Sequence, residues 1–387
     1  MSHGLVPLDK KLALNKEVQE TVERILPKLC QRLNALHGQN QSDRYWRIIC
    51  GRWLLGFVDV LYQRWNLIDQ ALTEFPIDHA GGFTLDHSMI APRRSQDFAQ
   101  QRISHEWNTH VFTAILRHRN VAIELLPQGR PTNGTSLNLE DRFIKQAAVA
   151  LWGLLAKRSP MCIADSYFGT WSEMRLALEN RSLPARLIRV IPSKVEYSES
   201  MRESVKLTST AGESFEEFLF GNLHRWLPYS WVEDFSELSA GPHTRHLPQN
   251  PHTIFTANAH HSSDYFMIYM AKQAERGSRI VLSQHGGLYG EGEVRSRNEE
   301  HELAIADTYV TWGWKDSSYN NIVHGPNQIS QPTSTACSSR EGGLLVVMDT
   351  TFRYSRYSWE TRPERDFYGE SCALLYSKLS ADIQKKS

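Results

Sequence analysis

The 387-residue sequence predicts an α/β fold in which a helical N-terminal part precedes a parallel, doubly wound sheet. Two observations predict this fold. Residues 15–157 contain long stretches whose apolar side chains recur at helical spacing, and from residue 158 onward short apolar runs alternate with helical stretches. Strands that alternate with helices are typical of a parallel sheet with helices on its faces.

The N-terminal part predicts a first helix over residues 15–37. Its apolar side chains follow helical spacing at Val18, Val22, Ile25, Leu26, Leu29, Leu33 and Leu36. Pro27 falls inside this pattern and is expected to kink or split the helix, because proline lacks the backbone N–H that the helix needs.

Further helices are predicted downstream. Ser42 and Asp43 can cap a second helix that runs to about Trp65 and, being apolar on all sides, is expected to be buried. Residues 101–126 and 139–157 also predict helices, and the segment between them is rich in turn-forming residues.

The predicted strands are the short apolar runs, each of which ends in a polar or glycine-rich turn. They are residues 160–164, 185–191, 252–256, 279–282 and 309–312. Ligands of parallel α/β sheets bind beyond the carboxyl ends of the strands. All five turns are therefore expected at one functional edge.

The sequence divides into two predicted domains. Residues 1–335 form an N-terminal α/β domain, with a helical part over 1–157 and the sheet over 158–325. Residues 326–340, rich in Ser, Thr, Pro and Gln, are predicted as a linker. Residues 341–387 begin a second, Rossmann-like domain that is expected to be shortened and incomplete, because about forty residues remain after its first strand.

The composition is that of a soluble globular protein. Lys plus Arg and Asp plus Glu each number 43, so no global field favours nucleic acid as a partner. No signal peptide and no run of the roughly 20 apolar residues that span a bilayer is present. We therefore expect a cytoplasmic protein, at most peripheral at the inner face of the membrane. The five cysteines form no CxxC pair and are expected to be reduced: Cys30, Cys50, Cys162, Cys337 and Cys372.

The turn after the strand at residues 279–282 is the first candidate site. Gln284 and His285 are followed by Gly286 and Gly287, and adjacent glycines let backbone N–H groups approach an anion closely. His285 can donate to a phosphate or carboxylate, or exchange a proton near neutral pH. The alternative, a tight turn whose histidine caps a helix, stays open on spacing alone.

Carboxylates form the second set of candidates. Asp165 ends a predicted strand and can act as a general base or bind a sugar hydroxyl, although an Asx turn or a helix cap is the more common role. Glu233 and Asp234 are adjacent carboxylates, which retaining glycosyl transfer can use as a nucleophile, although solvated surface charges are the more common case.

Basic side chains form the third set. His260, His261 and Asp264 follow another predicted strand and are residue types that bind metals. Adjacent histidines are not expected to share one face, however, and no compact triad is present, so no metal site is predicted. Arg47 and Arg52 lie in the apolar second helix, where each needs either an internal ion pair or a substrate carboxylate. Arg353, after the strand at 342–348, is a candidate for binding a nucleotide phosphate.

Several of these segments together resemble a transferase family of bacterial O-antigen clusters. The matching segments are Tyr45 to Ile49, Gly51 to Leu54, Asp59 to Tyr62, Asp165 to Phe168, Gln284 to Gly290, His301-Glu302, Ile305 to Asp307 and Thr311 to Trp314. Their order and spacing match over roughly residues 40–320. No GxSxG, SxxK, HExxH or dinucleotide GxGxxG motif and no set of kinase motifs is present, which disfavours hydrolases, kinases and dehydrogenases.

This family is similar to retaining β-Kdo transferases. The resemblance implies a GT-B-like pair of Rossmann-type domains, CMP-Kdo or a related nucleotide sugar as donor, no further cofactor, and a lipid-linked or oligosaccharide acceptor. It also implies double displacement, with Glu233 or Asp234 as nucleophile and with Asp165 in an acid/base or acceptor-orienting role. His285 would contact the donor and Arg353 would face the donor phosphate or carboxylate, with Tyr289 and His260 among the substrate-binding residues. The alternative is a degenerate homologue that binds a glycan or a partner protein without turnover.

Overall fold

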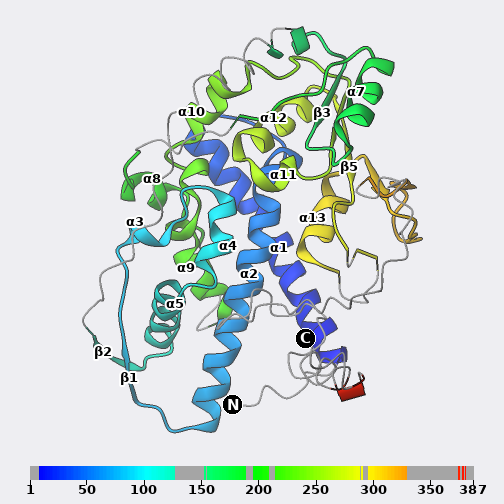
Figure 1. Ribbon diagram of the computed structural model, residues 1–387. Helices are drawn as coiled ribbons and strands as arrows, with labels where there is room; N and C mark the ends of the chain where they lie inside the picture. The colour runs from blue at the N-terminus through cyan, green and yellow to red at the C-terminus, as the bar shows by residue number, and fades with distance from the viewer. Residues whose placement is uncertain are drawn as a thin grey trace.

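The computed structural model describes residues 8–126, 152–153, 155–188, 195–208, 214–287, 289–290 and 295–328, together with positions 374, 377, 378 and 380. Two long helices run through the middle of the molecule, a five-stranded sheet lies at one end, and a two-stranded sheet lies at the other (Figure 1). The predicted linker, apart from residues 326–328, and the predicted second domain lie outside the described residues.

The longer helices are α1 (Leu8–His37), α2 (Asp43–Glu74), α5 (His105–His118), α7 (Thr170–Glu179), α9 (Phe215–Trp226), α12 (Asp264–Glu275) and α13 (Arg297–Ile305). The shorter ones are α3 (His87–Ile90), α4 (Phe98–Gln101), α8 (Glu199–Ser204), α10 (Phe235–Ala240) and α11 (Ala259–Ser262). Three single 3-10 turns cover Ser95–Asp97, Tyr229–Trp231 and Pro242–Thr244.

Helix α1 continues through Pro27 as one helix of 30 residues, so the predicted split is wrong. The side chains on either side of the proline, Leu26 and Leu29, are buried against the rest of the protein. Their burial outweighs the backbone hydrogen bond that a proline removes from a helix interior.

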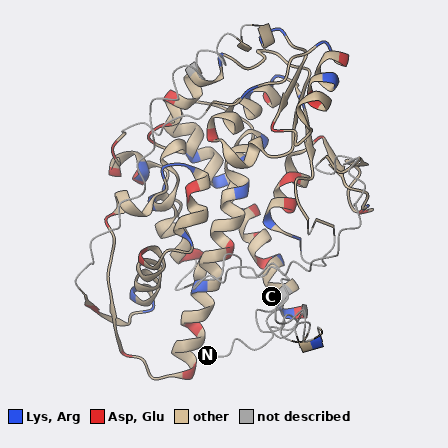
Figure 2. Ribbon diagram, in the orientation of Figure 1, with Lys and Arg blue, Asp and Glu red and all other residues tan. Residues whose placement is uncertain are grey.

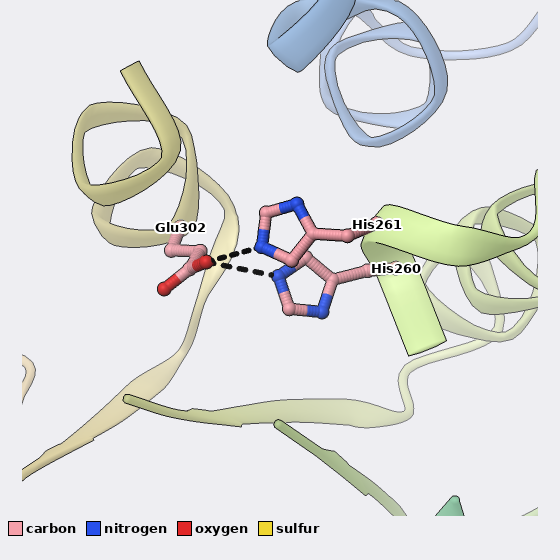
Figure 3. Close-up of side chains that lie close together, drawn as sticks. All are labelled: His260, His261 and Glu302. Atoms are coloured by element: carbon pink, nitrogen blue, oxygen red, sulfur yellow. Dashed lines mark hydrogen bonds and ion pairs between the residues drawn. The ribbon is translucent and has the colours of Figure 1, made fainter. Parts of the chain in front are cut away.

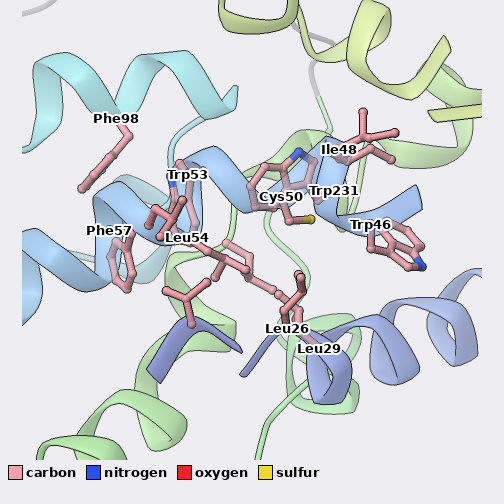
Figure 4. Packing of buried hydrophobic residues seen from close by; sticks show 14 of the residues in the cluster. Leu26, Leu29, Trp46, Ile48, Cys50, Trp53, Leu54, Phe57, Phe98 and Trp231 are labelled. Atoms are coloured by element: carbon pink, nitrogen blue, oxygen red, sulfur yellow. The ribbon is translucent and has the colours of Figure 1, made fainter. Parts of the chain in front are cut away.

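Helix α2 begins and packs as its sequence predicts. The Ser42 side chain accepts a hydrogen bond from the backbone N–H of Tyr45 at 3.1 Å, which caps the first turn. The helix is buried on most of its circumference, against α1, α5, α12 and α13. Trp53 stacks on Phe57 with ring centroids 4.4 Å apart and meets Trp231 edge-on at 5.4 Å. Figure 4 draws these side chains within the core.

The five-stranded sheet has the order β3-β4-β5-β6-β7, and every neighbouring pair is parallel. The strands are β3 (Met161–Ala164), β4 (Thr253–Thr256), β5 (Arg279–Ser283), β6 (Thr308–Thr311) and β7 (Ile322–His324). The predictions of β3, β4, β5 and β6 as strands are confirmed. The architecture is a mixed α/β fold with parallel sheets and many helices, compatible with a Rossmann-like fold.

Two predicted elements differ from the structure. The helix expected over 101–126 ends at His118, and β2 (Ala122–Leu125) follows and pairs in parallel with β1 (His79–Gly82). The strand expected over 185–191 is not formed over 185–188, its described part, although the Ala185 backbone N–H donates to the carbonyl of Ile163 on β3 at 2.7 Å.

Charged side chains of both signs are interspersed over the helices and strands (Figure 2). Cys30, Cys50 and Cys162 are buried free thiols, as expected of reduced cysteines. Over the described ranges, no helix combines the length and the apolar character needed to cross a membrane.

Candidate active site at the carboxyl edge of the sheet

Because β3 to β6 are parallel, the turns that follow them lie along one edge of the sheet. The turn at Asp165 follows β3, α11 follows β4, and the turn beginning at Gln284 follows β5. The expected shared edge is thus confirmed for these turns. The turn expected after residues 185–191 lies outside the described residues.

The turn after β3 holds two non-glycine residues in the left-handed region, Asp165 with a φ of 43° and Tyr167 with a φ of 62°. Such conformations cost free energy and are concentrated at functional sites. Ser166 lies between these two residues, and its hydroxyl donates a hydrogen bond to Glu173 on α7. Glu173 also forms an ion pair with Arg186 at 3.0 Å. These contacts hold the turn in its strained shape.

A cavity of about 420 Å³ opens beside this turn. Asp165 and Asp234 both line it, so the fold brings together two carboxylates that are far apart in sequence. Its lining residues are Arg94, Gln96, Asp97, Asp165, Leu187, Ile188, Ser230, Asp234, Leu238, Ser262, Ser263, Asp264 and Tyr265.

Burial raises the pKa of the Asp165 carboxyl, and the nearby Glu173 carboxylate raises it further. Burial is also the main cause of the raised pKa of Asp97 and of Asp264. Asp264 accepts hydrogen bonds from the backbone N–H and the hydroxyl of Ser95, which fixes one wall of the cavity. The cavity therefore favours carboxyl groups that exchange protons closer to neutrality than solvated ones do.

Glu233 and Asp234 are adjacent in sequence but differ in their surroundings. The two oxygens of Glu233 accept hydrogen bonds from Arg202 at 2.7 and 2.8 Å. The Glu233 side chain is 1% exposed and the Arg202 side chain is 0% exposed. Arg202 also donates to the backbone carbonyls of His224, Arg225 and Leu227. Glu233 thus anchors α8 against the end of α9, whereas Asp234 lines the cavity.

In the turn after β5, the Gln284 side chain is bound within the protein, whereas the backbone at Gly286 and Gly287 is open to a ligand. The Gln284 side chain accepts hydrogen bonds from Trp312 and Trp314 at 3.0 and 2.8 Å and donates to the Gly286 carbonyl at 2.7 Å. Its amide is therefore used within the fold. A Cβ atom added at Gly286 or Gly287 would meet no atom within 4 Å, so their backbone faces open space.

His285 and Tyr289 belong to a buried cluster around Glu302 on α13. His285 Nδ1 lies 3.4 Å from Glu302 Oε1, and the Tyr289 hydroxyl donates to the same oxygen at 3.3 Å. The His285 side chain is 16% exposed, the most of these groups. Tyr289 is 6% exposed. Of the two, His285 is the one placed to meet a ligand.

His260 and His261 point side by side from α11 toward Glu302 (Figure 3). Their Nε2 atoms lie 3.2 and 2.5 Å from Glu302 Oε1. The expectation that adjacent histidines cannot share a face is therefore wrong here. Helix α11 is only four residues long, and the two rings tilt together with centroids 4.0 Å apart.

The titration of this cluster is dominated by burial. Burial lowers the pKa of His260 to about 3 and also lowers the pKa of His261 and of His285. Burial raises the pKa of Glu302 to about 7, opposed by His285 and by the hydroxyls of Tyr309 and Tyr289. The imidazoles are therefore neutral at neutral pH.

The arginines of α2 make contacts within the protein. Arg47 contacts both oxygens of Glu23 at 2.7 and 2.6 Å, the ion-pair alternative that the sequence left open. Arg52 donates to the Asn298 side chain at 3.0 Å and to the His261 carbonyl at 3.2 Å, which links α2 to the cluster. Arg353 lies outside the described residues.

The sequence assigned no role to Glu302 or to Arg94, and it offered Asp264 only as a metal ligand beside the two histidines. Glu302 stands next to His301 in one of the matching segments, and Asp264 follows the two histidines. Only the packing of α13 and α12 against the edge of the sheet shows that these side chains face a cluster or a cavity.

Comparison with known proteins gives one family. Searches of curated proteins and of solved structures found no match. The sequence model of one protein family, described as LIC12162 family transferase, matches residues 6–387, which is nearly the whole chain. The chain therefore belongs to the LIC12162 family of transferases.

Proposed function

We propose that this transferase is a retaining glycosyltransferase of bacterial surface-polysaccharide assembly, which transfers Kdo or a related sugar from a CMP-activated donor to a glycan acceptor. The observation that carries the proposal is the cavity at the carboxyl edge of a parallel sheet, lined by Asp165 and Asp234. Membership of a transferase family and the matching segments support it. The reaction would take place in the cytoplasm or at the inner face of the cytoplasmic membrane.

Asp234 is the proposed nucleophile. Retention by double displacement requires a carboxylate that can reach the anomeric carbon. Asp234 lines the cavity, whereas both oxygens of Glu233 are bound by Arg202. In the first step, an Asp234 oxygen forms a bond to the anomeric carbon while the bond from that carbon to the CMP phosphate breaks.

Asp165 is the proposed general base of the second step. The acceptor hydroxyl attacks the anomeric carbon, the bond to Asp234 breaks, and the hydroxyl proton passes to Asp165. Burial already raises the pKa of this carboxyl, which favours its taking up a proton. Its backbone, held at a positive φ, presents the side chain beside the same cavity.

The donor is proposed to extend from the cavity toward the turn after β5. Kdo carries a carboxylate, and Arg94 supplies a positive charge in the wall of the cavity. Gly286 and Gly287 leave room beside their backbone for a phosphate, with His285 as an adjacent donor.

Transfer is tested by incubating the protein with CMP-Kdo and a synthetic glycan acceptor and following CMP release and product configuration. We expect Asp234→Asn to lower kcat by at least about 1,000-fold, as loss of a nucleophile does. Asp165→Asn should slow the second step, so that a protein–sugar adduct on Asp234 accumulates and appears in the intact mass.

Glu237→Gln is the matched control, because Glu237 is an exposed carboxylate on α10 close to Asp234. It should leave transfer unchanged. The proposal fails if the wild type neither binds CMP nor turns over the donor. The assignment of the nucleophile fails if Asp234→Asn keeps full activity while folded.

A further inference from the structure

The cluster on α11 and α13 has the composition of a metal site. His260, His261 and Glu302 offer three ligand atoms that lie within 4.8 Å of one another, and all three residues are buried. Imidazole nitrogen and carboxylate oxygen are ligands that Zn²⁺ and similar divalent transition metals accept. We propose that His260, His261 and Glu302 bind a divalent transition-metal ion of the zinc class.

The spacing of the ligand atoms fits such an ion. Ligand atoms about 2.0–2.1 Å from a tetrahedral centre are about 3.3 Å apart. The distance from His260 Nε2 to Glu302 Oε1 is 3.2 Å, which matches this edge length. The distance from His261 Nε2 to the same oxygen is 2.5 Å and would lengthen by about 0.8 Å to admit the ion.

The surroundings suit a cation. Glu302 is contacted by imidazoles and by two tyrosine hydroxyls, and its side chain is fully buried. A buried carboxylate is stabilised by a positive charge close to it. Arg52 supplies positive charge near Glu302, and a divalent ion would supply positive charge in direct contact with the carboxylate.

The carboxylate is also oriented as metal-binding carboxylates usually are. The Tyr309 hydroxyl donates to Glu302 Oε2 at 2.7 Å, which leaves Oε1 facing the two histidines. A hydrogen bond from a residue that does not itself bind the metal fixes the orientation of the side chain that does. Three protein ligands leave a fourth position for water or another small ligand.

The test uses the full-length protein, stripped of metal by chelation and dialysis, with ZnCl₂ and CoCl₂ as probes. We expect one tightly bound zinc per chain, a rise of Tm with zinc, and the visible absorption of four-coordinate Co²⁺. His261→Gln and Glu302→Gln should each weaken zinc binding by more than about tenfold, since even loss of an outer hydrogen bond costs that much.

His224→Gln is the matched control, because His224 is a buried histidine on a different helix, α9. It should bind zinc as the wild type does. Absence of bound zinc and of the Co²⁺ band in the wild type overturns the inference, and this result does not depend on whether the variants fold. Unchanged zinc affinity in both folded ligand variants also overturns it.

These measurements contain no nucleotide or sugar, so they are independent of the transfer reaction. Zinc binding without transfer would contradict only the proposed function. Transfer by a protein that binds no metal would contradict only the metal site.

Discussion

His110 on α5 is 6% exposed, and its Nδ1 atom accepts a hydrogen bond from the backbone N–H of Leu85 at 3.0 Å. A proton on Nδ1 would abolish this acceptor. Burial lowers the pKa of His110 to about 4, and the charges of His87 and Arg117 lower it further. The side chain is therefore neutral in the folded protein over a pH range in which an unfolded histidine becomes protonated.

This difference predicts a pH dependence of stability. Between pH 6.5 and about 4 the unfolded chain binds a proton at His110 and the folded chain does not, so stability falls as pH falls across this window and is unaffected above it. The contribution of His110 is at most about 3 kcal/mol. His110→Gln, whose amide oxygen can still accept from Leu85, should reduce the slope of the unfolding free energy against pH in urea titrations.

The control for this prediction is His252→Gln, because the His252 side chain is exposed. It should leave the slope as in the wild type. Equal slopes for His110→Gln and the wild type would show that His110 does not titrate as its burial indicates.

At the candidate site, the sequence predicted which side chains carry chemistry better than it predicted their environments. Asp165 and Asp234 were both named and share a cavity. The difference between Asp234 and its neighbour Glu233 could not be predicted, because it depends on Arg202, which is remote in sequence. Convergence of His260 and His261 on Glu302 likewise requires the packing of α11 against α13.

At the scale of elements, α1 shows how packing overrides local preference. Pro27 lies inside a continuous helix whose neighbouring side chains, Ile25, Leu26 and Leu29, are 0–1% exposed. Proline in a helix interior is about 3 kcal/mol less favourable than alanine. We expect Pro27→Ala to raise the free energy of unfolding by up to about 3 kcal/mol in urea denaturation.

Gln31→Ala, an exposed position one turn later in α1, is the control and should change stability by only a few tenths of a kcal/mol. A decrease in stability on Pro27→Ala would mean that the proline ring makes packing contacts worth more than the hydrogen bond it removes.

Periodicity located the buried strands β3, β4, β5 and β6 but not β2. These four strands are short apolar runs that end in turns, a pattern that local sequence carries. β2 has only four residues and follows a helical pattern without a strong break, so the helix was predicted to continue through it. Its parallel pairing with β1, some forty residues earlier, is a long-range contact that periodicity does not encode.

At the scale of the whole molecule, the helices and the sheet share a large hydrophobic core, beside which β3, β4 and α7 form a smaller buried cluster. A single buried cluster contains Leu54 and Phe57 of α2 together with Ile254 of β4 and Ile280 of β5. The parts predicted separately as a helical segment and a sheet segment therefore bury the same apolar surface. Elements that share a core are expected to unfold as one cooperative unit.

Leu54→Ala tests this cooperativity. Leu54 is 0% exposed, and truncation of such a leucine costs about 2–5 kcal/mol. In native-state hydrogen exchange, peptides from α2 and peptides from β4 and β5 should lose protection by the same free energy, although the substitution lies only in α2. Leu178→Ala on α7, where the side chain is 59% exposed, is the control and should leave the hydrogen-exchange protection of both sets of peptides unchanged. Loss of protection in α2 with unchanged protection in β4 and β5 would mean that the helical part and the sheet unfold separately, despite the apolar contacts that join them.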